Sequence, residues 1–314
     1  MKAATIDRFS TPAEVRDVDA PALEDRAVLF RVTAAGVNPV DWKIRDGQGG
    51  ERSFPLILGQ DFAGVVEQVG SGVTRVKKGD RIFGCARAHG AYAEFSEIRD
   101  GVADSPFSRI PAGMSDAQAA ALPTPALTAL AALEALGVRT GTDVLIVGAG
   151  GAVGGTAVQI ARTRGAAVTA VVKGGQEAEA RSMGATTVIA VTGDDTLSAV
   201  QTAHSGPFEA VLDLVSDGET LKRNAPLLKG GGVLVTTIHA ADEAWFRERK
   251  IRAINIVMNQ TPQSSPAGLD QIAQMVVDGT LVVKVASERP LSDANAVLDG
   301  IKSGTIAGKV ILRP

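Results

Sequence analysis

Residues 144–161 constrain the fold more than any other part of this chain. They read Val-Leu-Ile-Val-Gly-Ala-Gly-Gly-Ala-Val-Gly-Gly-Thr-Ala-Val-Gln-Ile-Ala, a buried-strand pattern followed at once by a glycine turn and a helix start. Without side chains in the turn, backbone N–H groups at a helix N-terminus can approach a pyrophosphate, whose negative charge the helix dipole favours. We therefore expect a dinucleotide to bind here; the alternative is a tight turn that binds nothing. The residues concerned are Gly148, Ala149, Gly150, Gly151, Ala152, Val153 and Gly154.

The next strand, expected over residues 167–172, bears on which dinucleotide binds. In dinucleotide-binding folds an acidic residue near the end of this strand holds the ribose 2′-hydroxyl of NAD, whereas a basic residue accommodates the 2′-phosphate of NADP. Here the strand runs into Lys173, and the first carboxylate is that of Glu177. Lys173 therefore favours NADPH, with Arg181 as a weaker candidate for the same phosphate. The alternative is a solvated lysine at a strand end.

Composition limits the class of protein. A chain of 314 residues exceeds a typical single core, so two domains are expected. A net charge of -3 gives no electrostatic reason to expect nucleic acid or an anionic membrane as a partner. Cys85 is the single cysteine, which excludes an intramolecular disulfide and a multi-cysteine zinc lobe. No apolar stretch reaches membrane-spanning length and the first residues lack a signal-peptide core, so we expect a cytoplasmic protein.

The arrangement of elements changes along the chain. Short alternating segments in the first third, at residues 28–37, 64–69, 81–84 and 91–96, predict a small antiparallel barrel or sandwich. From residue 141 onward strands and helices alternate, which predicts a doubly wound parallel sheet. Its expected strands are residues 144–147, 167–172, 187–189, 210–214, 233–237 and 251–257. Towards the C-terminus we expect a strand over 281–285, a helix over 294–301 and a last strand over 309–312.

Several widely spaced motifs then carry a resemblance to a known family. They are Ala-Gly-Val-Asn-Pro-Val-Asp-Trp-Lys at 35–43, Leu-Gly-Gln-Asp-Phe-Ala-Gly-Val-Val at 58–66, Val-Lys-Lys-Gly-Asp-Arg-Ile at 76–82, Leu-Thr-Ala at 127–129, the glycine turn and Gly-Lys-Val-Ile-Leu at 308–312. With these motifs in this order over nearly its whole length, the chain resembles the zinc-independent quinone oxidoreductase branch of the medium-chain dehydrogenase/reductase superfamily.

The resemblance implies an α/β protein with two domains. One is a discontinuous, β-rich, GroES-like catalytic domain of residues 1–118 and 264–314. The other is a Rossmann NADP-binding domain of residues 119–263, a doubly wound parallel sheet. Members of the family are commonly homodimers joined through the last strand of the nucleotide-domain sheet, which would be near residues 251–257 here.

The resemblance also assigns roles in cofactor binding. It implies that Asn38 lies beside the nicotinamide, that the Thr128 hydroxyl helps to anchor the cofactor, and that Lys309 brings a charge to the phosphate side. The alternatives are a turn asparagine before Pro39, a threonine bonded to its own helix backbone, and an ordinary strand-end lysine.

Departure from the zinc alcohol dehydrogenases of the same superfamily is informative. Those enzymes carry a metal-binding cysteine where this chain has Asn38, and Gly-His-Glu where it has Gly-Gln-Asp at 59–61. A catalytic zinc usually needs three protein ligands from cysteine, histidine or carboxylate. The histidines, His89, His204 and His239, are scattered, so we expect no metal.

Several polar residues of these motifs are candidates for a role in hydride transfer. Addition of a hydride to an enone or quinone places negative charge on oxygen, which needs a hydrogen-bond donor and then a proton. The amide of Asn38 is the first candidate donor. Asp41 and Lys43 are a candidate proton relay, although a solvated ion pair is an equal alternative. Tyr92 is more typical of barrel packing than of catalysis, and His239 is a candidate for the cofactor pocket beyond its strand.

These observations predict an NADPH-dependent reductase that transfers hydride to a quinone or an α,β-unsaturated carbonyl without a metal. One alternative is an enoyl-thioester reductase, although no basic docking patch for an acyl carrier stands out. Another is an NADPH-binding sensor or structural protein with little turnover, because its nucleotide motif would look the same.

Overall fold

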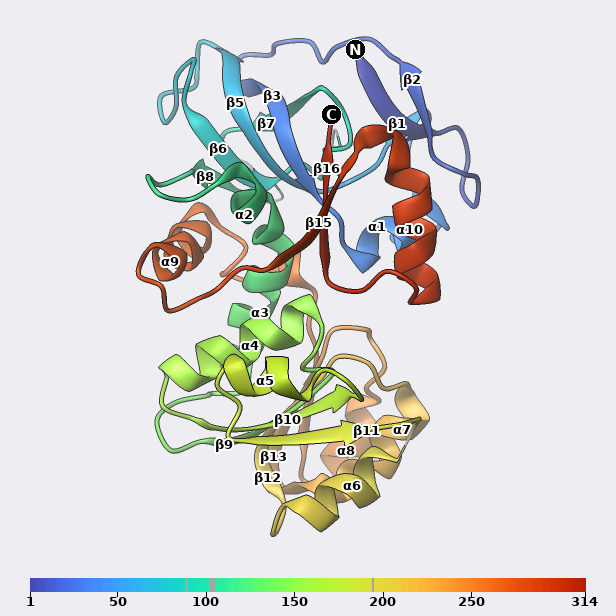
Figure 1. Cartoon of the computed structure of the whole chain (residues 1–314), viewed down its shortest axis with the longest axis vertical. Coiled ribbons are helices and arrows are strands. Elements are labelled where there is room, and N and C mark those ends of the chain that lie inside the picture. The colour runs from blue at the N-terminus through green and yellow to red at the C-terminus, as the bar shows by residue number, and fades with distance from the viewer. Residues whose placement is uncertain (88–89, 102–104, 194) are drawn as a thin grey trace. The chain divides into compact units, whose positions relative to one another are not determined.

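The computed structural model describes residues 1–87, 90–101, 105–193 and 195–314 (Figure 1). The chain forms two compact units. The first contains residues 1–124 and 264–314, and the second contains residues 125–263. The first unit is therefore discontinuous in sequence, with the second inserted between its two parts.

The first unit is built on a largely antiparallel seven-stranded sheet. Its order is β15-β16-β3-β5-β6-β8, and β7 also pairs with β3. The strands are β3 (Ala27–Gly36), β5 (Asp61–Val69), β6 (Arg81–Cys85), β7 (Phe95–Arg99), β8 (Phe107–Arg109), β15 (Val285–Pro290) and β16 (Lys309–Arg313). A smaller sheet contains β1 (Lys2–Ile6), β2 (Glu14–Asp17) and β4 (Leu56–Ile57). The apolar faces of both sheets meet in one core, in which Phe30 and Phe62 stack with ring centroids 4.1 Å apart.

The described part of the first unit also contains the α-helices α1 (Pro39–Arg45), α2 (Asp116–Ala121), α9 (Pro266–Val277) and α10 (Ala294–Ser303). The N-terminus of α2 follows from its sequence, because the Ser115 hydroxyl accepts a hydrogen bond from the backbone N–H of Gln118. Helix α1 packs beside α10, an arrangement that matters for the site described below.

The second unit is a six-stranded parallel sheet of order β11-β10-β9-β12-β13-β14. The strands are β9 (Asp143–Val147), β10 (Ala167–Lys173), β11 (Thr187–Val191), β12 (Phe208–Asp213), β13 (Leu228–Thr236) and β14 (Arg252–Asn255). Helices cover both faces of this sheet (Figure 1): α4 (Ala152–Thr163), α5 (Glu177–Ser182), α6 (Thr196–Ala203), α7 (Gly218–Arg223) and α8 (Glu243–Glu248). The long helix α3 (Pro123–Ala135) starts at the junction of the two units. The expected α/β fold, a β-rich GroES-like domain with a Rossmann-type parallel sheet, is confirmed.

Two predicted strands are displaced. Residues 281–284 form no strand, because the N–H groups of Thr280 and Leu281 bond to the Met275 carbonyl and so terminate α9; the strand is β15, beginning at Val285. The predicted strand at 91–96 begins only at Phe95. The residues before it contact the other sheet through an isolated bridge between Ala93 and Ala3.

In the described part of the chain, no helix is both long and apolar enough to cross a membrane.

Candidate active site

Strand pairing in the first unit brings together three polar residues that lie far apart in sequence. Gly36, at the end of β3, pairs with Asp61 at the start of β5 and with Ile311 of β16. Asn38 and Lys309 therefore lie close to Asp61. Position 36 has to be glycine, because an added Cβ would collide with the Ala120 carbonyl and lie 3.1 Å from the Lys309 Nζ.

These three side chains form a buried hydrogen-bonded set. The Lys309 Nζ donates to the Asn38 Oδ1 at 2.6 Å, and the Asn38 Nδ2 donates to the Asp61 Oδ2 at 2.7 Å. The Lys309 Nζ also lies 3.5 Å from the same Asp61 oxygen. The other oxygen of Asp61 accepts a hydrogen bond from the Thr124 hydroxyl at 2.7 Å. Burial lowers the pKa of Lys309, while the charge of Asp61 opposes that shift.

A second buried pair, Asp41 and Tyr92, lies next to this set. The Tyr92 hydroxyl donates to the Asp41 Oδ2 at 2.8 Å, and the backbone N–H of Asn38 donates to the same oxygen at 2.8 Å. The Asp41 Oδ1 is buried and has no hydrogen-bond partner among the described residues. Burial raises the pKa of Asp41 to about 7, although both hydrogen bonds act in the opposite direction. A pKa in this range suits a group that donates a proton near neutral pH.

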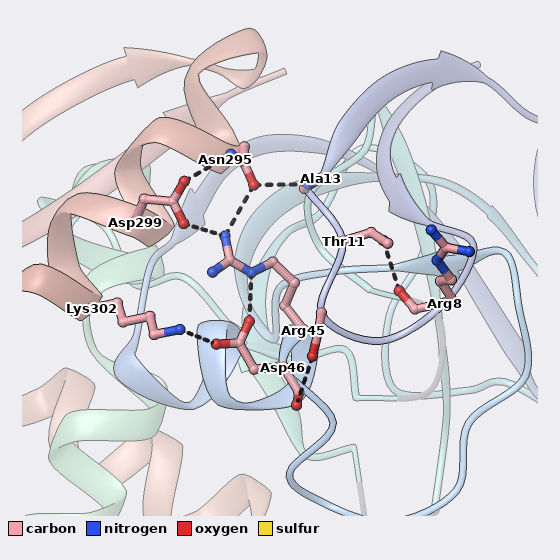
Figure 2. Close-up of polar contacts among 9 residues, drawn as sticks. Arg8, Thr11, Ala13, Arg45, Asp46, Asn295, Asp299 and Lys302 are labelled. Carbon is pink, nitrogen blue, oxygen red and sulfur yellow. Dashed lines mark hydrogen bonds and ion pairs between the residues drawn. The ribbon is translucent and has the colours of Figure 1, made fainter.

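Both of these groups depend on the position of α1, whose first turn carries Asn38 and Asp41. The other end of α1 is tied to α10 (Figure 2). The guanidinium of Arg45 donates to Asp299 at 2.6 Å and to Asn295 at 3.0 Å, and Lys302 donates to Asp46 at 2.6 Å. Asn295 also accepts the backbone N–H of Ala13. This network, which we call the α1–α10 clamp, fixes the C-terminal end of the short helix.

The glycine turn of the second unit connects β9 to α4. Gly148 has φ +85°, a conformation that favours glycine. An added Cβ on Gly154 would collide with the Gly148 carbonyl, so this glycine is needed for close packing of the turn. Gly151 is the N-cap of α4 but has no side chain with which to cap the helix. The first N–H groups of α4, those of Ala152, Val153 and Gly154, have no acceptor within the helix. An added Cβ on Gly151 would meet only one atom, at 3.5 Å. The turn thus places the first N–H groups of α4 directly after a residue with open space around it.

Lys173 is the last residue of β10, next to the glycine turn in the sheet, and its side chain is exposed. The loop after it is held by Gln176, whose Oε1 accepts the backbone N–H of Lys173 at 3.2 Å. The amide of Gln176 also occupies the space where a Cβ on Gly150 would lie. Position 150 is therefore restricted by Gln176, a contact that the local sequence pattern gave no reason to expect.

Three further predicted site residues lie on α1, on α3 and in the loop after β13. Lys43 is half-buried with its Nζ 5.8 Å from the centre of the Trp42 ring, whereas Asp41 faces Tyr92. His239 is exposed in the loop after β13, with φ 58°. Thr128 is buried in α3 of the second unit. His89, one of the three histidines weighed as metal ligands, lies outside the described residues.

Three members of the buried site were not predicted as such: Asp61, Thr124 and Tyr92 in its role as the partner of Asp41. One signal in the sequence points to Asp61 and Lys309. Each is a charged residue at the first position of its strand and is followed by a run of apolar residues, and opposite charges at buried strand ends need one another.

Comparison with known proteins agrees with this architecture. Residues 24–106 match the alcohol dehydrogenase GroES-like domain, and residues 183–312 match a zinc-binding dehydrogenase family. A quinone oxidoreductase of Rattus norvegicus is 31% identical, in an alignment that covers 99% of this chain and 97% of that protein.

The chain belongs to the medium-chain dehydrogenase/reductase superfamily. An alcohol dehydrogenase of Geobacillus stearothermophilus is 28% identical over 100% of this chain and 99% of that protein. The structure of a quinone oxidoreductase from Coxiella burnetii superposes with a TM-score of 0.89, at 28% identity, over 100% of this chain and 99% of that chain. The chain is therefore an oxidoreductase of this superfamily, and its fold indicates a nicotinamide cofactor.

Proposed function

We propose that this oxidoreductase uses NADPH to reduce a quinone or an α,β-unsaturated carbonyl without a metal. The observation that carries the proposal is the buried set Lys309–Asn38–Asp61, in which Asn38 stands where the zinc enzymes carry a metal-binding cysteine and accepts a hydrogen bond from Lys309. The quinone oxidoreductase name of the rat relative supports a quinone as acceptor.

The donor set does not fit a catalytic zinc ion. Zinc prefers thiolate, imidazole and carboxylate ligands. Asn38 offers an amide whose oxygen accepts a hydrogen bond from Lys309, and both oxygens of Asp61 accept hydrogen bonds. A lysine ammonium 3.5 Å from the Asp61 carboxylate would repel a metal cation at the same place. In the ranges that the structure describes, no group of three His, Cys, Asp or Glu residues is arranged to hold a metal.

The glycine turn fits the diphosphate of a dinucleotide. The backbone N–H groups at the N-terminus of the twelve-residue helix α4 favour an anion, and there is open space around its N-cap, Gly151. When bound, a reduced nicotinamide supplies the hydride. Lys173, exposed at the end of β10 with no carboxylate before Glu177, supports a preference for the 2′-phosphate of NADPH. Thr128 and His239 remain further candidates for cofactor contacts.

Reduction leaves negative charge on the acceptor oxygen, and the residues of the buried site are suited to receive it. The Asn38 amide donates one hydrogen to Asp61 and has a second to offer to the oxygen. Asp41 holds a proton near neutral pH and is the candidate proton source, with Tyr92 keeping its carboxyl in place. Lys43, on the same short helix, remains a candidate member of the proton path.

We also propose a homodimer joined through β14. This strand is the edge of the parallel sheet in the second unit, and an open edge can pair with a second copy. Sedimentation equilibrium tests this proposal, since a monomer at micromolar concentration would contradict it.

The activity is tested by following NADPH oxidation with a panel of quinones, short alkenals and enoyl-CoA, repeated with NADH. We expect turnover with a quinone or alkenal and a preference for NADPH. Faster turnover of enoyl-CoA would instead assign an enoyl-thioester reductase. Tight NADPH binding with no oxidation by any acceptor would favour a sensor or structural protein and would overturn the proposed activity.

A further inference from the structure

Lys309 is a buried cation, and its hydrogen-bond partners in the described part of the chain, Asn38 and Asp61, belong to the first unit. Its side chain is 5% exposed, and that of its counter-ion Asp61 is fully buried. Removing an ammonium group from water is costly unless it is paired and hydrogen-bonded. The Lys309 Nζ meets both conditions through Asn38 and Asp61, so its charge and two of its three donors are already committed.

The chemistry of these groups fixes the orientation of the Asn38 amide. An ammonium can only donate hydrogen bonds, so the Asn38 oxygen must face Lys309. An ionised carboxylate can only accept, so the amide nitrogen must face Asp61. Because one N–H is used by Asp61 at 2.7 Å, a single N–H of this side chain is left for another acceptor.

The contact with Lys309 also strengthens that remaining donor. A hydrogen bond from a cation to an amide oxygen draws electron density away from the nitrogen, and linked hydrogen bonds polarise one another at low dielectric. At 2.6 Å the bond from Lys309 to Asn38 is short. Without Lys309 the orientation of the Asn38 amide would depend on Asp61 alone, and the amide would be a weaker donor.

We propose that Lys309 is a positioning residue that orients and polarises the Asn38 amide, so that its free N–H stabilises the negative oxygen of the reduced acceptor. This inference rests on the proposed function. It differs from the role that family resemblance implies for Lys309, a charge beside the cofactor phosphate, because moving the Nζ to a phosphate would leave Asp61 buried without its counter-ion.

The first test compares Lys309→Met with Lys309→Arg. We expect Lys309→Met to lower kcat roughly 10- to 100-fold, while the dissociation constant of NADPH, measured by fluorescence, changes less than twofold. Lys309→Arg, which keeps the charge and the donors, should recover a large part of kcat. A tenfold weaker binding of NADPH with unchanged kcat would contradict the proposal and support the phosphate role.

A double-mutant cycle with Asn38→Ala separates positioning from general damage. If Lys309 acts through Asn38, the double variant should lose no more kcat than Asn38→Ala alone. Additive losses would overturn the proposal.

A measurement that needs no turnover distinguishes failure of this inference from failure of the proposed function. The side-chain NH₂ signal of Asn38, observed in protein labelled with ¹⁵N-asparagine and assigned with Asn38→Ala, should shift in Lys309→Met and return towards its original position in Lys309→Arg. An unchanged signal in a folded Lys309→Met protein would contradict the inference even if the enzyme is active. If the signal does shift in Lys309→Met but the wild-type protein oxidises no NADPH with any acceptor, the proposed function is contradicted while the inference about Lys309 and Asn38 stands.

Discussion

At the scale of single residues, burial in the fold raises the pKa of the Asp41 carboxyl into the neutral range. Its carboxyl is 1% exposed and accepts hydrogen bonds on one oxygen, while the other oxygen is buried without a partner among the described residues. Burial raises the pKa of Asp41 from 3.8 to about 7. The folded protein therefore holds a proton here that the unfolded chain releases above pH 4.

This difference predicts a pH dependence of stability. Because the folded-state pKa is the higher one, Asp41 should lower the free energy of unfolding progressively as pH rises from about 4 to about 7. In Asp41→Asn this loss, which is about 4 kcal/mol because the shift is about 3 pKa units, should disappear. Urea unfolding at several pH values measures the difference between the two proteins. Equal pH slopes for wild type and Asp41→Asn would contradict the raised pKa, and Asp17→Asn, at an exposed position, is the matched control.

Lys173 decides coenzyme preference if its ammonium contacts the 2′-phosphate. Lys173→Ala should reduce the ratio of kcat/KM for NADPH to that for NADH by about tenfold, the value of one exposed charge contact. Lys229→Ala is the control, because Lys229 is also exposed but lies at the opposite, amino-terminal end of its strand, paired with Glu209. If both variants keep the wild-type ratio, Lys173 is an ordinary surface lysine.

At the scale of elements, the junction of β9 and α4 should bind an anion. Gly151→Asp introduces a carboxylate at the N-cap of α4, where φ is -84° and space is open. Aspartate is a favourable N-cap, so we expect unchanged or slightly higher stability, by up to about 1 kcal/mol. The same charge should repel a diphosphate and weaken NADPH binding at least about tenfold.

Gly151→Ser provides the matched control, since it caps the helix without adding charge. Thermal unfolding and coenzyme titration of both variants separate the two effects. Normal NADPH affinity in Gly151→Asp would show that the diphosphate binds elsewhere.

The α1–α10 clamp should hold α1 in the position that its first turn requires. Arg45→Met removes a guanidinium whose side chain is 7% exposed and leaves Asp46 and Asp299 without it. Since Asp299 is 56% exposed and so screened by solvent, we expect a loss of only about 1–3 kcal/mol in stability. We also expect faster hydrogen exchange in α1 and a lower kcat.

Arg31→Met tests whether these effects are specific to the clamp, because the Arg31–Glu67 pair is exposed and should cost less than about 1 kcal/mol. Equal losses in the two variants would contradict a special role for Arg45.

At the scale of the whole molecule, the sequence predicted the fold better than the buried site. Strands β9 and β10, the glycine turn and the capped start at Ser115 follow from local periodicity and turn chemistry, which a short window of residues contains. Asn38 and Asp41 could be singled out for the same reason, within one motif.

The partners of Asn38 and Asp41 in the buried site could not be inferred from the sequence in this way. Lys309 and Asp61 are separated by 248 residues, and Tyr92 and Asp41 by 51. Pairing between them depends on the register of β16, β3 and β5, which the pattern of a single strand does not determine. Likewise, Asp41 and Lys43 are close in sequence, but a helical rather than an extended α1 turns them to different sides.

The account depends most on the uptake of a reduced nicotinamide dinucleotide by the glycine turn. The most direct measurement is a titration of the purified chain with NADPH and with NADH, followed by nicotinamide fluorescence. We predict saturable binding, with NADPH bound at least about tenfold more tightly than NADH. No saturable binding of either coenzyme to the folded protein would contradict the account.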